Sequence, residues 1–242
     1  MTGVQTCALP ILFAATQLAP RGLAATVSRL GIKARLDVGD ELRVLLPGRS
    51  DKLLRRELTA RKDAGLIATW MPSTAVSKLA ALDTAGAVRL PEGGFVDPFQ
   101  LTLGFLRAAI KRGAKIFERS RVKKITFTRK TATAFLDGGA ITTTNLAICI
   151  GEPTPLFKPL KRHLRHEERY AVLTEPLSAA VLAELRPPSA LISDTDVPPH
   201  RIWFTDDDRV LVTGADQKRP PDRLRDKTLV QRTGQLMYEL SR

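Results

Sequence analysis

The stretch from residue 90 to residue 151 constrains the fold of this 242-residue chain more than any other part. Asp97 stands where a helix N-cap belongs, and Pro98 suits the first helical position, where a backbone N–H has no intrahelical partner. Residues 98–112 are largely apolar with a thin polar stripe. This pattern predicts a mostly buried helix that ends at Gly113.

Strands are expected after this helix. Short β-branched segments at 122–128 and 131–136 alternate in polarity, and the turn residues 137–139 lead into a further strand at 140–144. These segments predict a small antiparallel sheet.

A second kind of strand is indicated by residues 146–150, which are apolar on both sides, as is typical of a covered parallel sheet. We expect this run and residues 114–117 to share one sheet, with the helix at 98–112 packed on it. Gly151 follows the run directly. Open α/β sheets bind ligands beyond the carboxyl ends of their strands, so Gly151 is a candidate for close backbone approach to a ligand.

This order of elements resembles the middle of the FAD-dependent oxidoreductases of the D-amino-acid oxidase type, which include glycine oxidase. The family usually has Ala-Thr-Gly or Ala-Ala-Gly where this chain has its last matching triplet, so only the glycine is kept. The residues that carry the resemblance are Gly94, Val96-Asp97-Pro98, Gly113-Ala114-Lys115-Ile116, Val122, Ile125 and Cys149-Ile150-Gly151.

The resemblance implies an α/β (mixed α+β) protein with part of a Rossmann-like FAD-binding domain and a mixed, largely antiparallel substrate domain. It implies FAD as the cofactor, contacted by Val122 through its backbone and by Cys149, Ile150 and Gly151. It implies oxidation of a small amine or amino acid by hydride transfer to the flavin. Since the cofactor carries that step, few acid–base residues are needed, and no catalytic residue is predicted.

Both ends of the chain suggest an incomplete protein. Residues 1–11 match the translation of a common sequencing adapter, and no G-x-G-x-x-G is present to hold a dinucleotide. We expect a fragment that binds FAD weakly or not at all. The expected divisions are 1–11 (artefact), 12–90 (substrate domain or cap), 91–156 (FAD-binding segment), 157–220 (substrate sheet) and 221–242 (truncated helix).

The second half predicts a hairpin with strands at 201–204 and 210–213, and Asp206-Asp207-Asp208 at its tip. Alternation places Arg201 and Trp203 on one face. The resemblance implies that an arginine grips the substrate carboxylate and that a strand aromatic lines the flavin face, so these two are the candidate substrate residues. The alternative is an edge-strand arginine beside a packed tryptophan.

Other elements follow from turn and capping residues. Helical pieces at 12–30 are expected to be interrupted at Pro20-Arg21-Gly22. Further helices are expected at 51–64, 74–79, 178–185 and 223–242, and strands at 34–46 and 170–174.

Composition excludes several classes of protein. The net charge is +13, but the basic residues are dispersed and only 5% of residues are aromatic, which disfavours nucleic-acid binding. No apolar run is long enough for a bilayer span. Cys149 is the one cysteine outside residues 1–11, which favours a reducing, cytoplasmic location and, among apolar neighbours, an inert packed thiol.

Metal binding is not expected either. His163, His166 and His200 are interpreted as exposed side chains, with no cysteine beside them. A non-catalytic binding or structural domain stays open as an alternative to an enzyme, and a basic nucleic-acid-binding module as a weaker one. The oligomeric state does not follow from the sequence.

Overall fold

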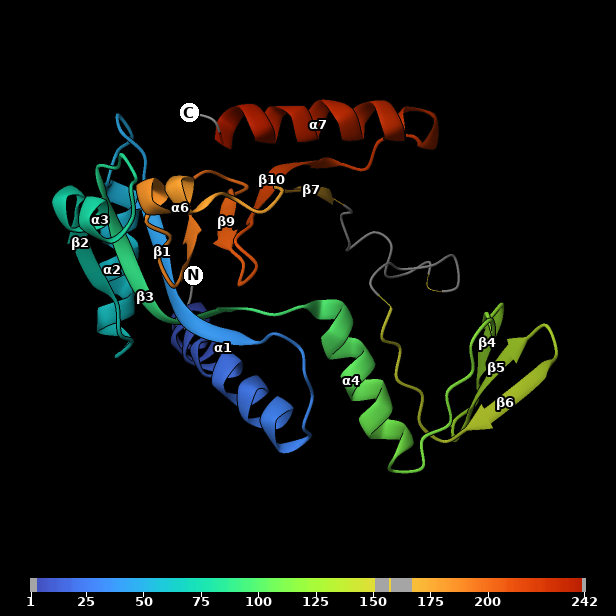
Figure 1. The fold of residues 1–242 in the computed structure, drawn as a ribbon. Helices are drawn as coiled ribbons and strands as arrows, with labels where there is room; N and C mark the ends of the chain where they lie inside the picture. The colour runs from blue at the N-terminus through green and yellow to red at the C-terminus, as the bar shows by residue number, and fades with distance from the viewer. Residues whose placement is uncertain (1–3, 151–156, 158–166, 241–242) are drawn as a thin grey trace. The chain divides into compact units, whose positions relative to one another are not determined.

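A computed structural model describes residues 4–150, 157 and 167–240 of the chain. It divides into two compact units, one formed by Met1–Ala108 with Arg169–Arg242 and the other by Ala109–Glu168. Figure 1 shows the elements of both. The first unit contains α1 (Val4–Arg29), β1 (Asp37–Leu45), α2 (Lys52–Asp63), β2 (Thr69–Pro72), α3 (Ser73–Leu79), β3 (Gly86–Phe95), most of α4 (Pro98–Ile110), most of β7 (Glu167–Leu173), α6 (Ala179–Leu185), β8 (Ala190–Ser193), β9 (Arg201–Phe204), β10 (Val210–Lys218), η2 (Asp222–Leu224) and α7 (Arg225–Leu240).

A seven-stranded mixed sheet is the framework of the first unit, with strand order β2-β3-β1-β8-β9-β10-β7. β1 pairs with β8 in parallel, whereas the β1–β3, β2–β3, β8–β9 and β9–β10 pairs are antiparallel. The mixed α/β class predicted from the sequence is confirmed.

One face of this sheet, which we call the apolar face, carries the main core. Leu42 and Val44 of β1, Ile192 of β8 and Val76 of α3 are all buried there in one cluster. Leu236 of α7 is fully buried against the neighbouring strands β10 and β7. Helices α3 and α7 therefore cover the same side of the sheet.

The opposite face, which we call the arginine face, carries an apolar cluster where α2 covers it. Leu54 and Leu58 of α2 pack there on Leu45, Val88 and Leu90. Alternation along β1 brings Glu41 and Arg43 to this same face, beyond the part that α2 covers. The sheet is thus left with polar side chains in the middle of its arginine face.

Helix α7 is also tied to the sheet by polar contacts. Gln217 of β10 donates from Nε2 to the hydroxyl of Tyr170 at 3.0 Å and accepts from Nη2 of Arg232 at 2.7 Å. On the neighbouring strand, Arg169 forms a two-pronged pair with Asp216, with Nε–Oδ1 at 2.9 Å and Nη2–Oδ2 at 2.7 Å. Paired contacts of this kind fix orientation as well as adding attraction.

The second unit holds a three-stranded antiparallel sheet of β4 (Lys124–Phe127), β5 (Ala132–Leu136) and β6 (Gly139–Thr143). Its hairpin turns at Gly138 and Gly139, as the sequence predicts, and Gly139 has a φ of +156°. The antiparallel part of the predicted middle region is therefore confirmed.

The predicted parallel strands of this unit are wrong. Neither 114–117 nor 146–150 forms a strand, and the side chains of Phe117, Ile148 and Ile150 are 67%, 45% and 52% exposed. A strand requires a hydrogen-bonding neighbour, and no described strand pairs with either segment. Both segments contain apolar side chains, but no described part of the chain packs over them to bury them.

The structure agrees with the predicted ends of α4 but not with its predicted burial. Asp97 caps it, accepting from the backbone N–H groups of Phe99 at 2.9 Å and Gln100 at 3.0 Å, and Gly113 follows it with a φ of +90°. Its predicted burial is wrong, because Ala108 is the one residue of this helix classed as buried. A Cβ added at Gly104 would lie 2.1 Å from Cγ2 of Ile32. The absence of a side chain at Gly104 therefore allows α4 to lie close to Ile32, just after α1.

The break predicted at Pro20-Arg21-Gly22 is also wrong, since α1 runs unbroken to Arg29. A proline removes one backbone hydrogen bond, and the contacts of α1 with β3 and β1, including the buried Val27, hold the helix in place. The stop predicted at Gly31 is present, with a φ of +65°.

Candidate substrate cavity on the arginine face

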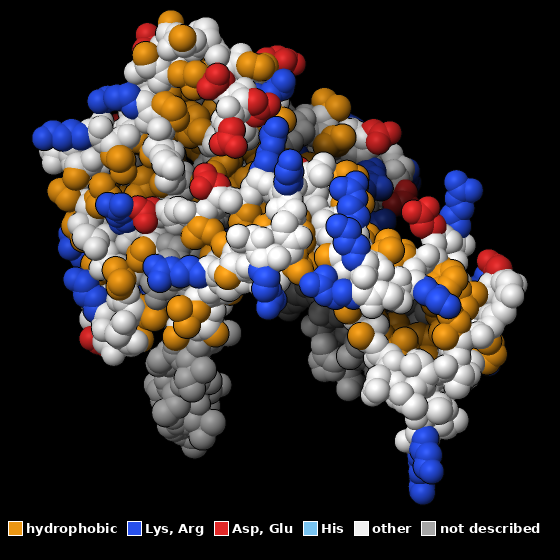
Figure 2. Space-filling model, turned by 60° about the horizontal axis from the view of Figure 1, so that its bottom comes forward, with side chains coloured by type: hydrophobic (Ala, Val, Ile, Leu, Met, Phe, Trp, Pro, Cys, Tyr) orange, Lys and Arg blue, Asp and Glu red, His pale blue; other side chains and the backbone are white. Residues whose placement is uncertain are grey.

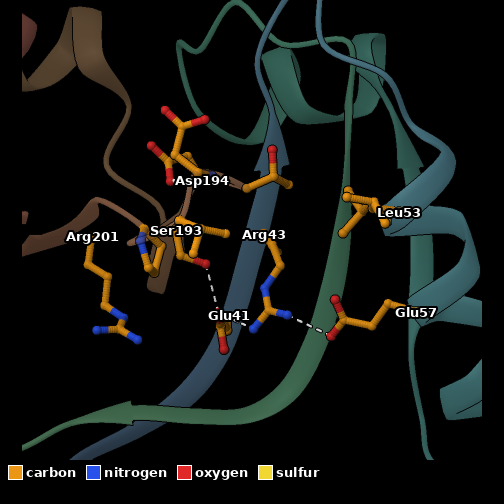
Figure 3. Close-up of a pocket in the computed structure, with 12 residues that line it drawn as sticks. Glu41, Arg43, Leu53, Glu57, Ser193, Asp194 and Arg201 are labelled. Atoms are coloured by element: carbon orange, nitrogen blue, oxygen red, sulfur yellow. Dashed lines mark hydrogen bonds and ion pairs between the residues drawn. The ribbon is translucent and has the colours of Figure 1, made fainter. Parts of the chain in front are cut away.

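A cavity of about 300 Å³ opens on the arginine face. Its lining comes from the sheet, from α2 and from the loop between β8 and β9. Figure 3 shows the arrangement, in which Arg43 lies between two carboxylates and Arg201 lies on the far side of Glu41. The lining residues are Glu41, Arg43, Leu53, Leu54, Glu57, Ser193, Asp194, Thr195, Asp196, Val197, Pro199 and Arg201.

Arg43 is held by two carboxylates. Its Nη1 donates to Oε1 of Glu57 at 2.6 Å and its Nη2 to Oε1 of Glu41 at 3.1 Å. Ser193 Oγ donates to the same oxygen of Glu41 at 2.7 Å. Burial by itself would lower the pKa of Arg43, but the charges of Glu41 and Glu57 outweigh it and the pKa lies above its usual value.

Glu57 also accepts two hydrogen bonds from Arg61 one helical turn along α2, with N–O distances of 2.9 and 2.7 Å. Burial would raise the pKa of Glu57, but the charge of Arg43 and the hydrogen bonds from Arg61 outweigh it. The pKa of Glu57 therefore lies below its usual value. This cluster is a fixed, internally neutralised wall of the cavity.

This wall makes stability depend on pH. A lowered folded-state pKa means that Glu57 stabilises the protein above the ordinary glutamate pKa of about 4.3, and that this stabilisation is lost as the pH falls through the folded value. Glu57→Gln should lower the free energy of unfolding at pH 7 by about 1–2 kcal/mol. The difference from wild type should shrink in urea titrations as the pH is lowered from 6 to 3.

The control for this prediction is Asp51→Asn, which removes the exposed Asp51–Arg55 pair from the same helix. Exposed pairs contribute roughly 0–1 kcal/mol, so little change is expected. A Glu57→Gln difference that stays constant down to pH 3 would contradict the assigned pairing.

Arg201 differs from Arg43 in having no carboxylate partner within 4.0 Å among the described residues, although its side chain lines the same cavity. The predicted hairpin is confirmed, and Arg201 stands opposite Thr213 across it. β9 lies between β8 and β10, so the alternative of an edge-strand arginine is wrong. Arg201 is thus a cation on an interior strand without a carboxylate partner in the described part of the chain.

Trp203 lies two residues further along the same face. It is 7% exposed and stacks on Phe95, with the ring centroids 5.3 Å apart and the planes inclined by 12°. A separate hollow of about 350 Å³ lies at this end, lined by both rings together with Arg35, Leu36, Asp37, Thr205 and Asp206. The structure thus confirms that Arg201 and Trp203 lie on the same face of the sheet. Arg201 lines the cavity beside Arg43, and Trp203 lines the separate hollow.

The structure describes three of the four residues that the resemblance implied for FAD. Val122 precedes β4 as coil, Cys149 and Ile150 lie in exposed coil, and Gly151 lies outside the described residues. The expectation of a packed Cys149 thiol is wrong, because the coil has no sheet to bury it. The described residues include no G-x-G-x-x-G turn that could receive the pyrophosphate of a dinucleotide.

The remaining expectations concern histidines and acids. His163 and His166 lie outside the described residues. His200 is half-buried rather than exposed, because Asp194 and Glu239 hold its ring from two sides. Asp206, Asp207 and Asp208 form the tip of the β9–β10 hairpin, as predicted.

The sequence reading missed Glu41, Arg43 and Glu57. The signal was present in Asp40-Glu41-Leu42-Arg43-Val44, where charged and apolar residues alternate along a strand. Such alternation is also typical of a sheet face that is open to solvent. Only the placement of α2 shows that this face forms the wall of a cavity instead.

In the part of the chain that the structure describes, no helix has the length and apolarity that a membrane crossing requires. Figure 2 shows Lys and Arg side chains spread among hydrophobic and neutral ones on the face in view, without one continuous basic patch.

Comparison with solved structures shows which fold this is. Glycine oxidase from Bacillus cereus superposes with a TM-score of 0.69 at 15% identity over 91% of this chain and 61% of its own. Glycine oxidase from Geobacillus kaustophilus gives 0.67 at 17% identity, covering 94% and 62%. L-proline dehydrogenase from P. horikoshii gives 0.66 at 15% identity, covering 93% and 63%. The chain therefore spans about three fifths of the length of these proteins.

No functionally curated protein matches this chain in sequence. The family comparison does: the model of the DAO family, described as FAD dependent oxidoreductase, matches residues 12–240. The chain belongs to the DAO family of FAD-dependent oxidoreductases.

Proposed function

We propose that this chain is the substrate-binding part of an FAD-dependent enzyme that oxidises an amine or amino acid, and that the cavity on the arginine face receives the carboxylate of an amino acid. Arg201 is the observation that carries this proposal. It lines the cavity and has no carboxylate partner among the described residues, whereas Arg43 has two. Family membership supports the redox class, and the structural neighbours named above include oxidases and a dehydrogenase of amino acids.

The chemistry of the two arginines separates their roles. A guanidinium that is already paired on both sides has little attraction left for a ligand, so Arg43 shapes the wall. An unpaired guanidinium binds a carboxylate through two parallel hydrogen bonds. Arg201 is therefore the anchoring group.

FAD supplies the hydride-accepting chemistry in this family. Val122, Cys149, Ile150 and Gly151 stay candidates from the resemblance alone. The 12–90, 91–156, 157–220 and 221–242 divisions, and a cytoplasmic location, likewise stay predictions.

The test compares L-proline with pyrrolidine, the same ring without the carboxylate, by saturation-transfer NMR on the whole chain. L-Proline should bind more tightly than pyrrolidine. Arg201→Met should remove the preference, weakening L-proline binding about 10- to 100-fold, the value of one charge-assisted carboxylate contact.

The matched control is Arg89→Met, which changes an arginine on a strand of the same sheet that pairs with Asp40 and does not line the cavity. It should leave the preference unchanged. Equal binding of L-proline by wild type and Arg201→Met, with both proteins folded by circular dichroism, would refute the assignment of Arg201.

A further inference from the structure

A second cavity lies on the apolar face, on the other side of the sheet from Arg201. Its volume is about 390 Å³. Its walls are aliphatic, but four carboxyl side chains and one histidine also line it: Asp83, Asp194, Asp196, His200 and Glu239. Arg49 pairs with Asp196 at 3.1 Å, so acidic groups outnumber cations at this site in a chain that is otherwise strongly basic.

Three of these side chains can share one ion. The ligand atoms of Asp194, Asp196 and His200 all lie within 4.8 Å of one another. Two ligand atoms on one divalent ion are about 3–4 Å apart when each bond is about 2.1 Å. A small closure of the loop between β8 and β9 would therefore bring all three into coordination.

Two of these side chains, Asp194 and His200, are already held in place by contacts on their outer atoms. Oδ1 of Asp194 accepts from the backbone N–H of Asp196 at 3.1 Å and of His200 at 3.0 Å, which leaves Oδ2 toward the ring of His200. Nε2 of His200 faces Oε2 of Glu239 at 3.2 Å. A histidine that gives its Nε2 hydrogen to a carboxylate presents the lone pair of Nδ1, the orientation in which histidines bind metals.

Space for the histidine ring is provided by Gly214 on β10. A Cβ at this position would lie 2.3 Å from Cδ2 of His200. Because Gly214 has no side chain, the ring of His200 can lie between Asp194 and Glu239.

An independent observation also points to a ligand in this cavity. Thr84 lines the cavity and is 5% exposed, yet its Oγ1 has no hydrogen-bond partner in the described structure. A buried hydroxyl left without a hydrogen-bond partner destabilises the folded protein. Water carried by a bound ion would supply the missing partner.

We propose that Asp194, Asp196 and His200 bind one divalent transition-metal ion, with Glu239 positioning the histidine. A mixed set of one imidazole and two carboxylates suits ions such as Mn²⁺ and Zn²⁺. This site meets the proposed substrate cavity at Asp194 and Asp196, which line both cavities. The ring of His200 and the guanidinium of Arg201 nevertheless belong to opposite faces of the sheet.

The test is titration of the whole chain with Mn²⁺, followed by calorimetry and by the loss of the free-ion electron paramagnetic resonance signal. One ion per chain should bind. Asp194→Asn and His200→Gln should each weaken binding about 100-fold or abolish it, and Glu239→Gln should weaken it about 10-fold.

Three further variants distinguish the outcomes. Gly214→Ala displaces the ring without changing a ligand and should also weaken Mn²⁺ binding, which covers the case in which Asp194→Asn fails to fold. Asp207→Asn, at the exposed hairpin tip, and the double change His163→Gln with His166→Gln should leave binding unchanged. Absence of Mn²⁺ binding by wild type would overturn the proposal, as would Mn²⁺ binding that survives His200→Gln and Gly214→Ala in folded protein.

Discussion

Leu42→Ala is expected to reduce the free energy of unfolding of the sheet-containing unit by about 2–5 kcal/mol. Leu42 is fully buried on β1, the strand between β3 and β8, and it packs in one cluster with Val44, Val76 and Ile192. Its removal leaves a cavity that strands fixed on both sides cannot close. The cost therefore includes lost contacts as well as lost burial.

Urea unfolding followed by tryptophan fluorescence measures this effect, because both tryptophans of the chain, Trp70 and Trp203, lie in the sheet. The midpoint should fall while the slope with denaturant stays the same. Leu53→Ala is the matched control: Leu53 is 79% exposed on α2, and its loss should change stability by less than about 0.5 kcal/mol. Equal effects of the two changes would mean that β1 is not the centre of the core.

The second large effect concerns the cofactor. This chain, expressed as given, is expected to leave gel filtration colourless after incubation with FAD. Dinucleotide-binding folds hold the pyrophosphate at a helix N-terminus that follows a glycine-rich turn, and no G-x-G-x-x-G is present in the sequence. Cys149 and Ile150 lie in exposed coil and form no sheet edge.

Absorbance at about 450 nm against protein concentration gives the flavin content of the eluted peak. A family member with its own G-x-G-x-x-G, prepared in the same way, serves as the positive control. Stoichiometric yellow protein from this chain would show that the cofactor site has been placed in the wrong residues. It would leave the metal site at His200 and the carboxylate anchor at Arg201 to be judged by their own tests.

Local chemistry determined much of what the sequence predicted correctly. The Asp97 cap, the stops at Gly31 and Gly113 and the turn at Gly138-Gly139 depend on groups within a few residues of one another. The hairpin that places Arg201 and Trp203 on one face is equally local, since side-chain alternation in a strand needs no distant partner.

Burial and pairing were decided by the tertiary structure. Residues 146–150 are as apolar as a covered strand, but hydrogen bonding to a neighbouring strand makes a strand, and none of the described strands pairs with them. The same holds for the sites. Arg43 and Arg201 read alike in the sequence, and only the placement of Glu41 and Glu57 shows that the first is neutralised and the second is not. The sequence predicts an exposed His200, whereas Asp194 from a loop and Glu239 from α7 lie on either side of its ring. Charge pairing between residues distant in the chain is a property of the fold, so sequence spacing could not reveal it.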